Sequence, residues 1–412
     1  MKSPSESRIV WTVAAVQFVN VIDFMMVMPL GPRFARALTI PESSLGAIGG
    51  AYTGAAAISG LAGAFILDRF DRRRALMVAM LGLAFGTAIG GFATGFASLI
   101  AARLVAGFFG GPATSIALSI VTDAVPAERR GQALSKVMGA FSIASILGVP
   151  AGLKLAELGG WQLPFFGIGA LCLVTTAVGQ WLLPTMPPRA SRLNRAALGA
   201  LFEHKRTIVA YALTAVMMAS GFLVVPNIAA YVQGNLEFPE HDLPWAYLAG
   251  GVASAFTMAI GGKLIDRFGS LRVTLVGCCA LAGIVYAGFI HTPPYVSVIG
   301  IFVLFMVSMS LRNLSANTLV TKVPRPEERA GFMSLQSCVQ HMACALGAFI
   351  SSKILTEGPN HTLVGMARVG WACIGLQLLV IVITAVVERD VLRPVDAIFG
   401  QRLGDADERG KP

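Results

Sequence analysis

Charged residues are scarce in this chain. Only 13% of its 412 residues are Asp, Glu, Lys or Arg, whereas 55% are hydrophobic. A water-soluble protein of this length needs far more charge to cover its surface. The composition therefore excludes a soluble globular protein and indicates that most of the chain is surrounded by lipid.

The sequence also lacks the short motifs of several common enzyme chemistries. It contains no Gly-x4-Gly-Lys-Ser/Thr phosphate loop, no His-Glu-x2-His pair and no Gly-x-Ser-x-Gly turn. The sequence therefore lacks the motifs typical of ATP hydrolysis, zinc proteolysis and serine hydrolysis. We expect no enzyme activity and no cofactor. Any transport would then be passive or driven by an ion gradient, and we expect a proton gradient.

Cysteines are few, and all six lie inside apolar runs without metal-ligand spacing. This placement predicts neither a metal site nor a disulfide framework. We interpret these residues as small packing side chains.

Long apolar runs are abundant. A helix crosses the hydrocarbon core of a bilayer with about 20 mostly apolar residues. Twelve such runs follow one another: Ile9–Leu30, Leu45–Leu67, Ala75–Ala93, Leu99–Val121, Leu134–Leu155, Leu163–Leu183, Thr207–Tyr231, Leu243–Ile265, Val273–Ile290, Val296–Val320, Phe332–Leu355 and Leu363–Val387. The first run is long, carries Asp23 and has no small-residue cleavage site behind it, so we expect a retained span rather than a signal peptide.

The net charge of +10 is distributed unevenly over the expected loops. With twelve spans both termini share one side, and that side receives 25 of the 32 Lys and Arg residues. This is the positive-inside bias of membrane proteins, so no nucleic-acid partner is expected. We predict a multi-pass protein of the cell inner membrane with both termini cytoplasmic.

Two charged segments occur twice along the chain. Ala64–Arg74 contains Asp-Arg-Phe-Asp, and Gly262–Arg272 contains Asp-Arg-Phe-Gly. Each is followed, 58 and 60 residues after its first Asp, by a Pro-x-Glu-Arg-x-Gly-like segment. Matched spacing of this kind indicates a duplicated unit.

The duplication predicts an all-α membrane protein of two six-helix bundles related by pseudo-two-fold symmetry. We expect an N-terminal bundle over residues 1–184, a cytoplasmic linker over 185–206, a C-terminal bundle over 207–388 and a cytoplasmic tail over 389–412. A monomer in the lipid bilayer is the expected state.

Three of the charges within the predicted spans need an explanation: Asp23, Arg103 and Arg312. Each costs about 3 kcal/mol to place in the hydrocarbon region and is functional by default. The first span runs outward and the fourth runs inward, so Asp23 and Arg103 reach overlapping depths and can pair. We favour a proton-responsive carboxylate at Asp23, while a purely structural ion pair is the alternative.

Further polar side chains within spans predict a water-filled central cavity for a small-molecule substrate. We expect the cavity to be lined by Asn20, Asn227, Tyr231, Arg312, Asn313, Gln336 and Gln340. His341 is a further proton-coupling candidate, although a lone His between helices is more often a packing residue. A kink or tight helix crossing is predicted at Gly148, Pro150 and Gly152, because Pro150 removes a backbone donor.

The repeated loop, the Arg of the fourth span and the Gly-Pro element of the fifth resemble the major facilitator superfamily, and within it the twelve-span drug:proton antiporter branch with its sugar- and arabinose-efflux-like members. The resemblance covers the chain from Asp23 to about Gly375 and implies the major facilitator fold. The family's inner loop reads Gly-x3-Asp-Arg-x-Gly-Arg-Arg/Lys. The second copy keeps Gly262, Asp266, Arg267 and Gly269, while the first keeps Asp68, Arg69, Arg72 and Arg73.

What the resemblance implies for these loops is a cytoplasmic gate that latches the two bundles together. The first copy departs from the pattern, with Ala64 for the first Gly and Asp71 for the second. Asp68 would sit beside the start of the eleventh span, where a helix dipole favours a carboxylate. The alternative is a set of solvated topogenic charges.

The fourth and fifth spans also match the family in part. Arg103, followed by Gly107, resembles an element linked to proton transfer, with Ala106 in place of the usual Gln. Gly148-Val149-Pro150-Ala151-Gly152 is a variant of the antiporter signature Gly-Pro-x2-Gly-Gly. Proton-coupled export is therefore the function that the resemblance favours.

Two other functions stay open at this point. A proton-coupled uptake symporter could use the same carboxylate, and a non-transporting membrane sensor could use the same fold. The three charges singled out above, one negative and two positive, favour anionic, zwitterionic or neutral solutes over dications.

Overall fold

The computed structural model describes residues 4–66, 69–126, 129–186, 204–291, 297–324 and 329–392. In these ranges the ordered elements are helices, apart from two short strands. The prediction of an all-α membrane protein is confirmed. Most of the predicted linker and tail lies outside the described residues.

Helices overlap all twelve predicted runs. In the first half they are α1 (Pro4–Met26), α3 (Leu45–Ile66), α4 (Arg72–Gly90), α5 (Phe96–Ala124), α6 (Arg130–Ile143) continued by the π-helical segment η4 (Ala144–Gly148) and α7 (Val149–Gly159), and α8 (Gln162–Leu182). In the second half they are α10 (Lys205–Val224) continued by η5 (Val225–Asn227) and α11 (Ile228–Gly234), α12 (Leu243–Phe268), α13 (Ser270–Val285) continued by η7 (Tyr286–Ile290), α14 (Val298–Val320), α15 (Arg329–Ile354) and α16 (Met366–Leu392).

Eleven helical segments of the described chain are long and apolar enough to cross a membrane. The twelfth, α15, is also long enough but is not among them. It carries Gln336, Gln340 and His341 within its length, which lowers its hydropathy. Because α15 packs along both α3 and α10, these polar groups lie between helices.

The helices form two groups that follow the two halves of the sequence. Within the first half α5 packs against α3 and α4, and within the second half α14 packs against α12 and α13. The halves meet where α3 packs against α15, and where α12 packs against η4 and α7. At Gly46 of α3 a Cβ would lie 2.2 Å from the carbonyl oxygen of Ala348, so only glycine allows this approach of α15.

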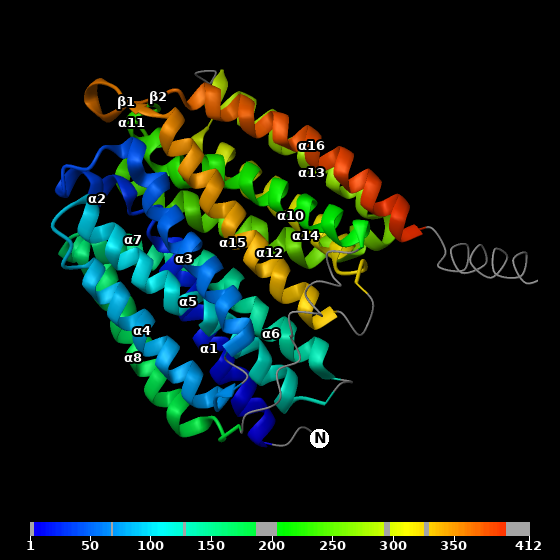
Figure 1. The fold of residues 1–412 in the computed structure, drawn as a ribbon. Coiled ribbons are helices and arrows are strands. Elements are labelled where there is room, and N and C mark those ends of the chain that lie inside the picture. Colours follow the sequence, from blue (N-terminus) through cyan, green and yellow to red (C-terminus); the bar gives the residue numbers. More distant parts are fainter. Residues whose placement is uncertain are drawn as a thin grey trace, which may run out of the picture.

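Figure 1 shows that the two ends of the molecule differ. We call the end that carries α2, α11 and the two strands the hairpin end. We call the opposite end, where α1 begins and α16 ends, the terminus end.

The hairpin end is built from short elements between the long helices. They are α2 (Gly31–Ala37), η1 (Glu42–Ser44), η6 (Glu240–Asp242), and η8 (Pro359–His361) between β1 (Thr356–Glu357) and β2 (Leu363–Val364). The strands are antiparallel, with Thr356 opposite Val364. Asn235 fastens α11 to this hairpin, because its Nδ2 donates to the Leu363 carbonyl at 3.1 Å and its Oδ1 accepts from the Leu363 N–H at 2.8 Å.

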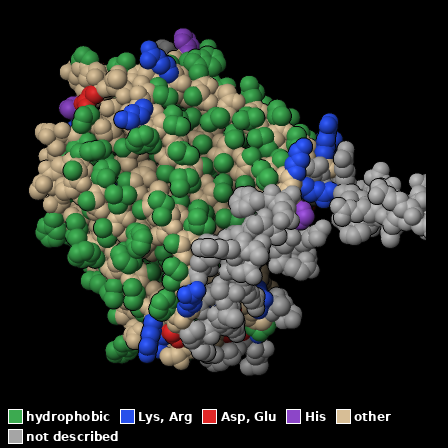
Figure 2. Space-filling model, in the orientation of Figure 1, with side chains coloured by type: hydrophobic (Ala, Val, Ile, Leu, Met, Phe, Trp, Pro, Cys, Tyr) green, Lys and Arg blue, Asp and Glu red, His purple; other side chains and the backbone are tan. Residues whose placement is uncertain are grey.

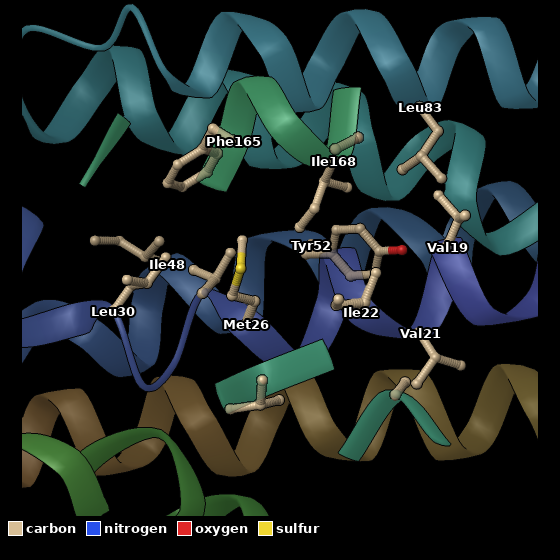
Figure 3. Packing of buried hydrophobic residues seen from close by; sticks show 14 of the residues in the cluster. Val19, Val21, Ile22, Met26, Leu30, Ile48, Tyr52, Leu83, Phe165 and Ile168 are labelled. Carbon is tan, nitrogen blue, oxygen red and sulfur yellow. The ribbon is translucent and has the colours of Figure 1, made fainter. Parts of the chain in front are cut away.

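Hydrophobic side chains fill the inside of each bundle and also cover its outside. Figure 3 shows α1 side chains such as Ile22 and Met26 packed among Ile48, Leu83 and Phe165 from other helices. On the face in Figure 2, hydrophobic groups cover the middle and charged groups gather toward the two ends. An apolar surface of this extent is the one expected of a multi-pass membrane protein in contact with lipid.

Candidate functional site

A buried ion pair lies inside the first bundle. Arg103 of α5 donates from Nη1 to Asp23 Oδ1 and from Nη2 to Asp23 Oδ2, both at 3.2 Å. Each side chain is only 1% exposed. The pairing predicted from the depths of the two residues is confirmed. In so dry an environment the two charges depend on each other, because an unpaired buried charge is far more costly.

Side chains from two other helices complete the surroundings of this pair. Thr87 of α4 donates to Asp23 Oδ1 at 2.7 Å. The ring of Tyr52 on α3 lies 4.5 Å from the guanidinium carbon of Arg103, a cation–π distance. The Asp23 side chain therefore accepts hydrogen bonds from three N–H or O–H donors of α4 and α5.

The predicted cavity residue Asn20 belongs to the same network. Its Oδ1 accepts from the Tyr52 hydroxyl at 2.9 Å, and its Nδ2 donates to the Gly110 carbonyl at 2.9 Å and to Thr114 Oγ1 at 2.6 Å. Helices α1, α3 and α5 are thus joined one turn from the ion pair. A change at Asp23 would reach three helices through these bonds.

The Gly-Pro element of the fifth span lies directly against α1. Gly148 ends the π-helical segment η4, and Pro150 and Gly152 lie in the first turn of α7. A Cβ on Gly148 would be 2.5 Å from Ile22 Cδ1, and one on Gly152 would be 2.2 Å from Met26 Sδ. The element therefore brings α7 close to α1 next to Asp23.

Arg312 occupies the corresponding place in the second bundle, with a different set of partners. All five of its N–H groups are used: Nε and Nη2 donate to Asn313 Oδ1, Nη1 donates to Ser220 and Gln377, and Nη2 also donates to the Met217 carbonyl. These acceptors are neutral, and Arg312 is fully buried. In this conformation the guanidinium therefore donates all its hydrogen bonds to neighbouring protein groups. Its direct contact with a substrate stays a prediction.

A cavity lies between the halves, on the terminus-end side of the middle of α14. It has a volume of about 350 Å³ and is lined by Phe141, Met258, Ser310, Asn313, Leu314, Asn317, Thr318 and Thr321. Phe141 comes from α6 of the first half, and the other lining residues come from α12, from α14 and from Thr321 directly after α14. The volume is within the range of small-molecule sites.

The other predicted cavity residues lie apart from this pocket. Asn227, at the break between α10 and α11, donates to Ser351 Oγ at 3.0 Å and links the break to α15. Tyr231 is buried and its ring packs 5.4 Å from that of Phe289. It is therefore a core residue in this conformation.

On α15, Gln336 is buried and its Oε1 has no hydrogen-bond partner among the described residues. Gln340 is half-buried one turn further on. His341 Nδ1 lies 2.8 Å from the Ser337 carbonyl of its own helix. No carboxylate among the described residues pairs with His341, and its role in proton coupling stays a prediction.

At the terminus end, the first charged loop is described only in part, because Asp68 lies outside the described residues. Arg69 is exposed. Arg72 pairs with Asp123 of α5, and Arg73 donates to the Gln180 carbonyl of α8. These contacts stay within the first bundle.

Asp71, which replaces the family's Gly, has a local role. Its Oδ1 accepts from the Arg74 N–H at 2.9 Å, which caps α4, and its Oδ2 accepts from the Met186 N–H at 2.7 Å. Asp71 is therefore the N-cap residue of α4.

The second charged loop also contacts its own bundle. Gly269 links α12 to α13 with a φ of 82°, a conformation that favours glycine. The Leu271 N–H donates to Glu388 of α16 at 3.1 Å, and Arg267 lies over the ring of Phe268. Gly262 and Asp266 are exposed. A gate made by these residues stays a prediction.

Sequence reasoning missed several residues of the two buried clusters. The missed residues are single polar side chains within apolar spans: Tyr52, Thr87, Ser220 and Gln377. Gln377 is an isolated amide, like the Asn and Gln residues from which the cavity was predicted. Such an amide was a usable signal. The hydroxyl residues gave none, because single hydroxyl side chains recur along these spans and those of Ser and Thr often bond only to their own backbone.

Within the described residues, no group of three His, Cys, Asp or Glu side chains could hold a metal ion. The six cysteines are free thiols. The candidate site thus consists of the Asp23–Arg103 cluster, the Arg312 cluster and the cavity beside α14.

Comparison with known proteins places this arrangement in a family. The sequence profile of the Major Facilitator Superfamily matches residues 13–348. A chloramphenicol resistance protein of Streptomyces lividans is 25% identical over 394 residues, which are 93% of this chain and 97% of that relative.

Solved transporter structures share the fold. A bacterial homologue of the human lysosomal transporter Spinster, inward-facing and unoccupied, has a TM-score of 0.77 at 14% identity over 95% of this chain and 99% of its own. The nucleoside transporter NupG has a TM-score of 0.73 at 16% identity, over 93% of this chain and 99% of its own. The xylose transporter XylE from E. coli has a TM-score of 0.70 at 14% identity, over 92% and 97%. Family and fold are those of transporters rather than enzymes, and the chain belongs to the Major Facilitator Superfamily.

Proposed function

We propose that this transporter exports a small organic solute from the cytoplasm in exchange for protons, across the cell inner membrane. The observation that carries the proposal is the buried Asp23–Arg103 pair, which puts one titratable carboxylate inside the first bundle. A relative named for chloramphenicol resistance supports export, because removal of a drug from the cell would confer resistance to it.

The geometry of Asp23 explains why proton binding would change the structure. Both of its carboxylate oxygens accept hydrogen bonds from Arg103. A proton turns one of these oxygens into a donor, which cannot face an Arg N–H. Proton uptake would therefore require Arg103 to move away, and the return of Arg103 would expel the proton.

The helices around the pair can carry this change to the rest of the molecule. Tyr52 on α3 contacts Arg103, and α3 also packs against α15 of the other half. Gly148 and Gly152 lie against α1 beside Asp23, while the adjoining η4 and α7 contact α12. These two helix–helix contacts between the halves are thus each one helix away from the ion pair.

The described conformation suits entry of a solute from one side. The halves are joined at the hairpin end, where Arg33 pairs with Glu240 and the Glu42 N–H donates to Glu357 Oε2 at 3.1 Å. The cavity lies toward the terminus end. If the termini are cytoplasmic, as the distribution of Lys and Arg favours, this is an inward-facing state that receives solute from the cytoplasm.

Everted membrane vesicles loaded with a quenchable pH dye test the proposal. Respiration acidifies the vesicle lumen, and chloramphenicol is added first, followed by a panel of small organic solutes. Export by antiport releases luminal protons when a substrate is added, so the dye fluorescence recovers. Vesicles containing the Asp23→Asn variant should show no recovery.

The same experiment identifies the rival functions. An uptake symporter would give no recovery in everted vesicles but would take up protons with its substrate in intact cells. A sensor without transport would give no solute-dependent proton movement in either preparation. Either result would contradict export by antiport.

A further inference from the structure

The structure assigns a specific role to two amides on α14: we infer that Asn313 and Asn317 form a donor–acceptor pair that selects uncharged solutes bearing both hydrogen-bond acceptors and donors. The inference rests on the proposed function only in taking the cavity beside α14 as the solute site. It adds the chemical class of the solute and the residues that recognise it.

Arg312 fixes which end of the Asn313 amide faces the cavity. Two of its N–H groups, on Nε and Nη2, donate to Asn313 Oδ1 at 3.1 and 2.8 Å. An amide oxygen that accepts two guanidinium N–H groups leaves the NH2 group on the other side. Asn313 lines the cavity and is only half-buried, and its Nδ2 has no acceptor among the described residues. The cavity therefore meets a pair of unused N–H donors.

Arg312 itself is held in place by the second bundle. Ser220 of α10 and Gln377 of α16 accept from Nη1 at 2.9 and 3.0 Å, and Gln377 Nε2 donates to Ser220 at 3.2 Å. A fully buried guanidinium held by three helices has little freedom to turn. Arg312 is thus a positioning residue for Asn313.

Asn317 supplies the complementary group. It lies four residues after Asn313, on the same face of α14, and lines the same cavity. Its Oδ1 receives no hydrogen bond from a described residue and has almost no accessible surface. A solute donor would therefore reach this oxygen only when the Asn317 amide turns it toward the cavity. A buried acceptor without a donor is unfavourable, so turning this oxygen toward a donor on the bound solute would stabilise the complex.

The remaining lining of the cavity disfavours ions. None of its described lining side chains is Asp, Glu, Lys, Arg or His, and Phe141, Met258 and Leu314 give it an apolar part. A cationic solute would meet the buried positive charge of Arg312 behind Asn313 without a carboxylate to offset it. An anionic solute would lose its hydration for two amide N–H donors, because Arg312 uses all five of its own.

Binding of three matched probes to the purified full-length protein in detergent tests the inference. Chloramphenicol is uncharged and carries amide, nitro and hydroxyl groups. Its succinate ester adds a carboxylate, and its deacylated amine base carries an ammonium in place of the amide. The wild type should bind chloramphenicol at least tenfold more tightly than either charged probe.

Two substitutions separate recognition from folding. Asn313→Asp keeps the oxygen that Arg312 holds but removes the donors, so it should weaken chloramphenicol binding by roughly tenfold or more. It should also raise the affinity for the amine base relative to chloramphenicol, since the new carboxylate offsets the charge of Arg312. A misfolded protein would not show such a change in preference. Asn317→Leu should weaken binding of chloramphenicol without this change.

Asn360→Asp is the matched control, because it makes the same chemical change at an exposed position of the hairpin end. It should leave the affinities of all three probes unchanged. Equal binding of all three probes by the wild type, tighter binding of a charged probe, or binding of none would overturn the inference, as would unchanged selectivity in Asn313→Asp. Detergent binding needs neither a gradient nor a direction of transport, so such a failure would leave the proton-exchange proposal standing.

Discussion

Arg103 and Asp23 show how one pair of residues can be both structural and responsive. Each charge is buried, and the two are paired with each other. Removing one partner of a buried pair costs about 3–5 kcal/mol while the other stays charged. A carboxylate can avoid this penalty by binding a proton and becoming neutral. A guanidinium cannot become neutral in this way, because it does not lose its proton at any physiological pH.

Arg103→Ala should therefore favour the neutral form of Asp23. The pH dependence of solute binding is expected to move to higher pH, and proton-driven transport should fall at least roughly tenfold. Arg103→Lys keeps the charge but loses the two-pronged contact, so its effect should be smaller. Solute affinity measured from pH 5 to pH 9 in detergent checks both variants. An unshifted profile in Arg103→Ala would mean that the pair only joins α1 to α5.

At the scale of elements, the hairpin end is where short segments of one half meet those of the other. Glu240 in η6 pairs with both Arg33 and Arg36 of α2, the latter at 3.6 Å. Arg36 also donates to Gln233 of α11 at 3.1 Å. Because these charges are partly exposed, each pair contributes only about 0.2–1 kcal/mol.

Glu240→Gln should loosen the hairpin end. The loss of two pairs at about 1 kcal/mol in total would change the ratio of closed to open molecules by roughly fivefold. Spin labels at Leu158 and His241, one on each half, would report a larger fraction of long distances. Glu157→Gln is the control, because Glu157 pairs with Arg33 and Lys154 within the first half. Equal distance distributions in both variants would show that these pairs do not hold the halves together.

The close contact between α3 and α15 can be tested by substituting its glycines. Gly46→Ala would place a methyl group 2.2 Å from the Ala348 carbonyl oxygen, so α3 and α15 must separate. Gly54→Ala, on the same helix, would put its methyl group 3.6 Å from Ala345 Cβ, an ordinary contact. Transport should fall strongly in Gly46→Ala and little in Gly54→Ala. Similar transport in the two variants, at equal amounts in the membrane, would contradict the packing argument.

At the scale of the whole molecule, the placement of the ends relative to the cell is the first matter to test. His241 at the hairpin end and Phe70 at the terminus end are exposed. In a Cys-free background, His241→Cys should react with an impermeant thiol reagent from outside intact cells. Phe70→Cys should react only after permeabilisation. Labelling of both from outside would contradict the twelve-span topology with cytoplasmic termini.

Much of the architecture could be predicted from the sequence because lipid imposes a simple requirement on length and hydropathy. The span boundaries moved by only a few residues, and the Asp23–Arg103 pair followed from the directions of two helices. The small elements of the hairpin end were harder. α2 and the β1–β2 pair are held by contacts between distant segments, such as Asn235 with Leu363, which no local pattern records.

The candidate site was predictable in kind and less so in detail. Asn313 was expected in a cavity and lines one, whereas Tyr231 was expected there and packs against Phe289 instead. Both are polar residues within spans, so their positions along the helix could not separate them. Which face a span turns toward the cavity depends on its neighbours, and the orientation of Asn313 depends on Arg312.

In the proposed mechanism, Asp23 is the group that exchanges a proton for the solute. Proton release on solute binding, followed with a pH indicator in weakly buffered detergent solution, tests it most directly. The solute is the one that restores dye fluorescence in the vesicles. Wild-type protein should release protons when that solute binds, and Asp23→Asn should bind it with similar affinity and release none. Proton release by Asp23→Asn equal to that of the wild type would contradict the account and direct attention to His341.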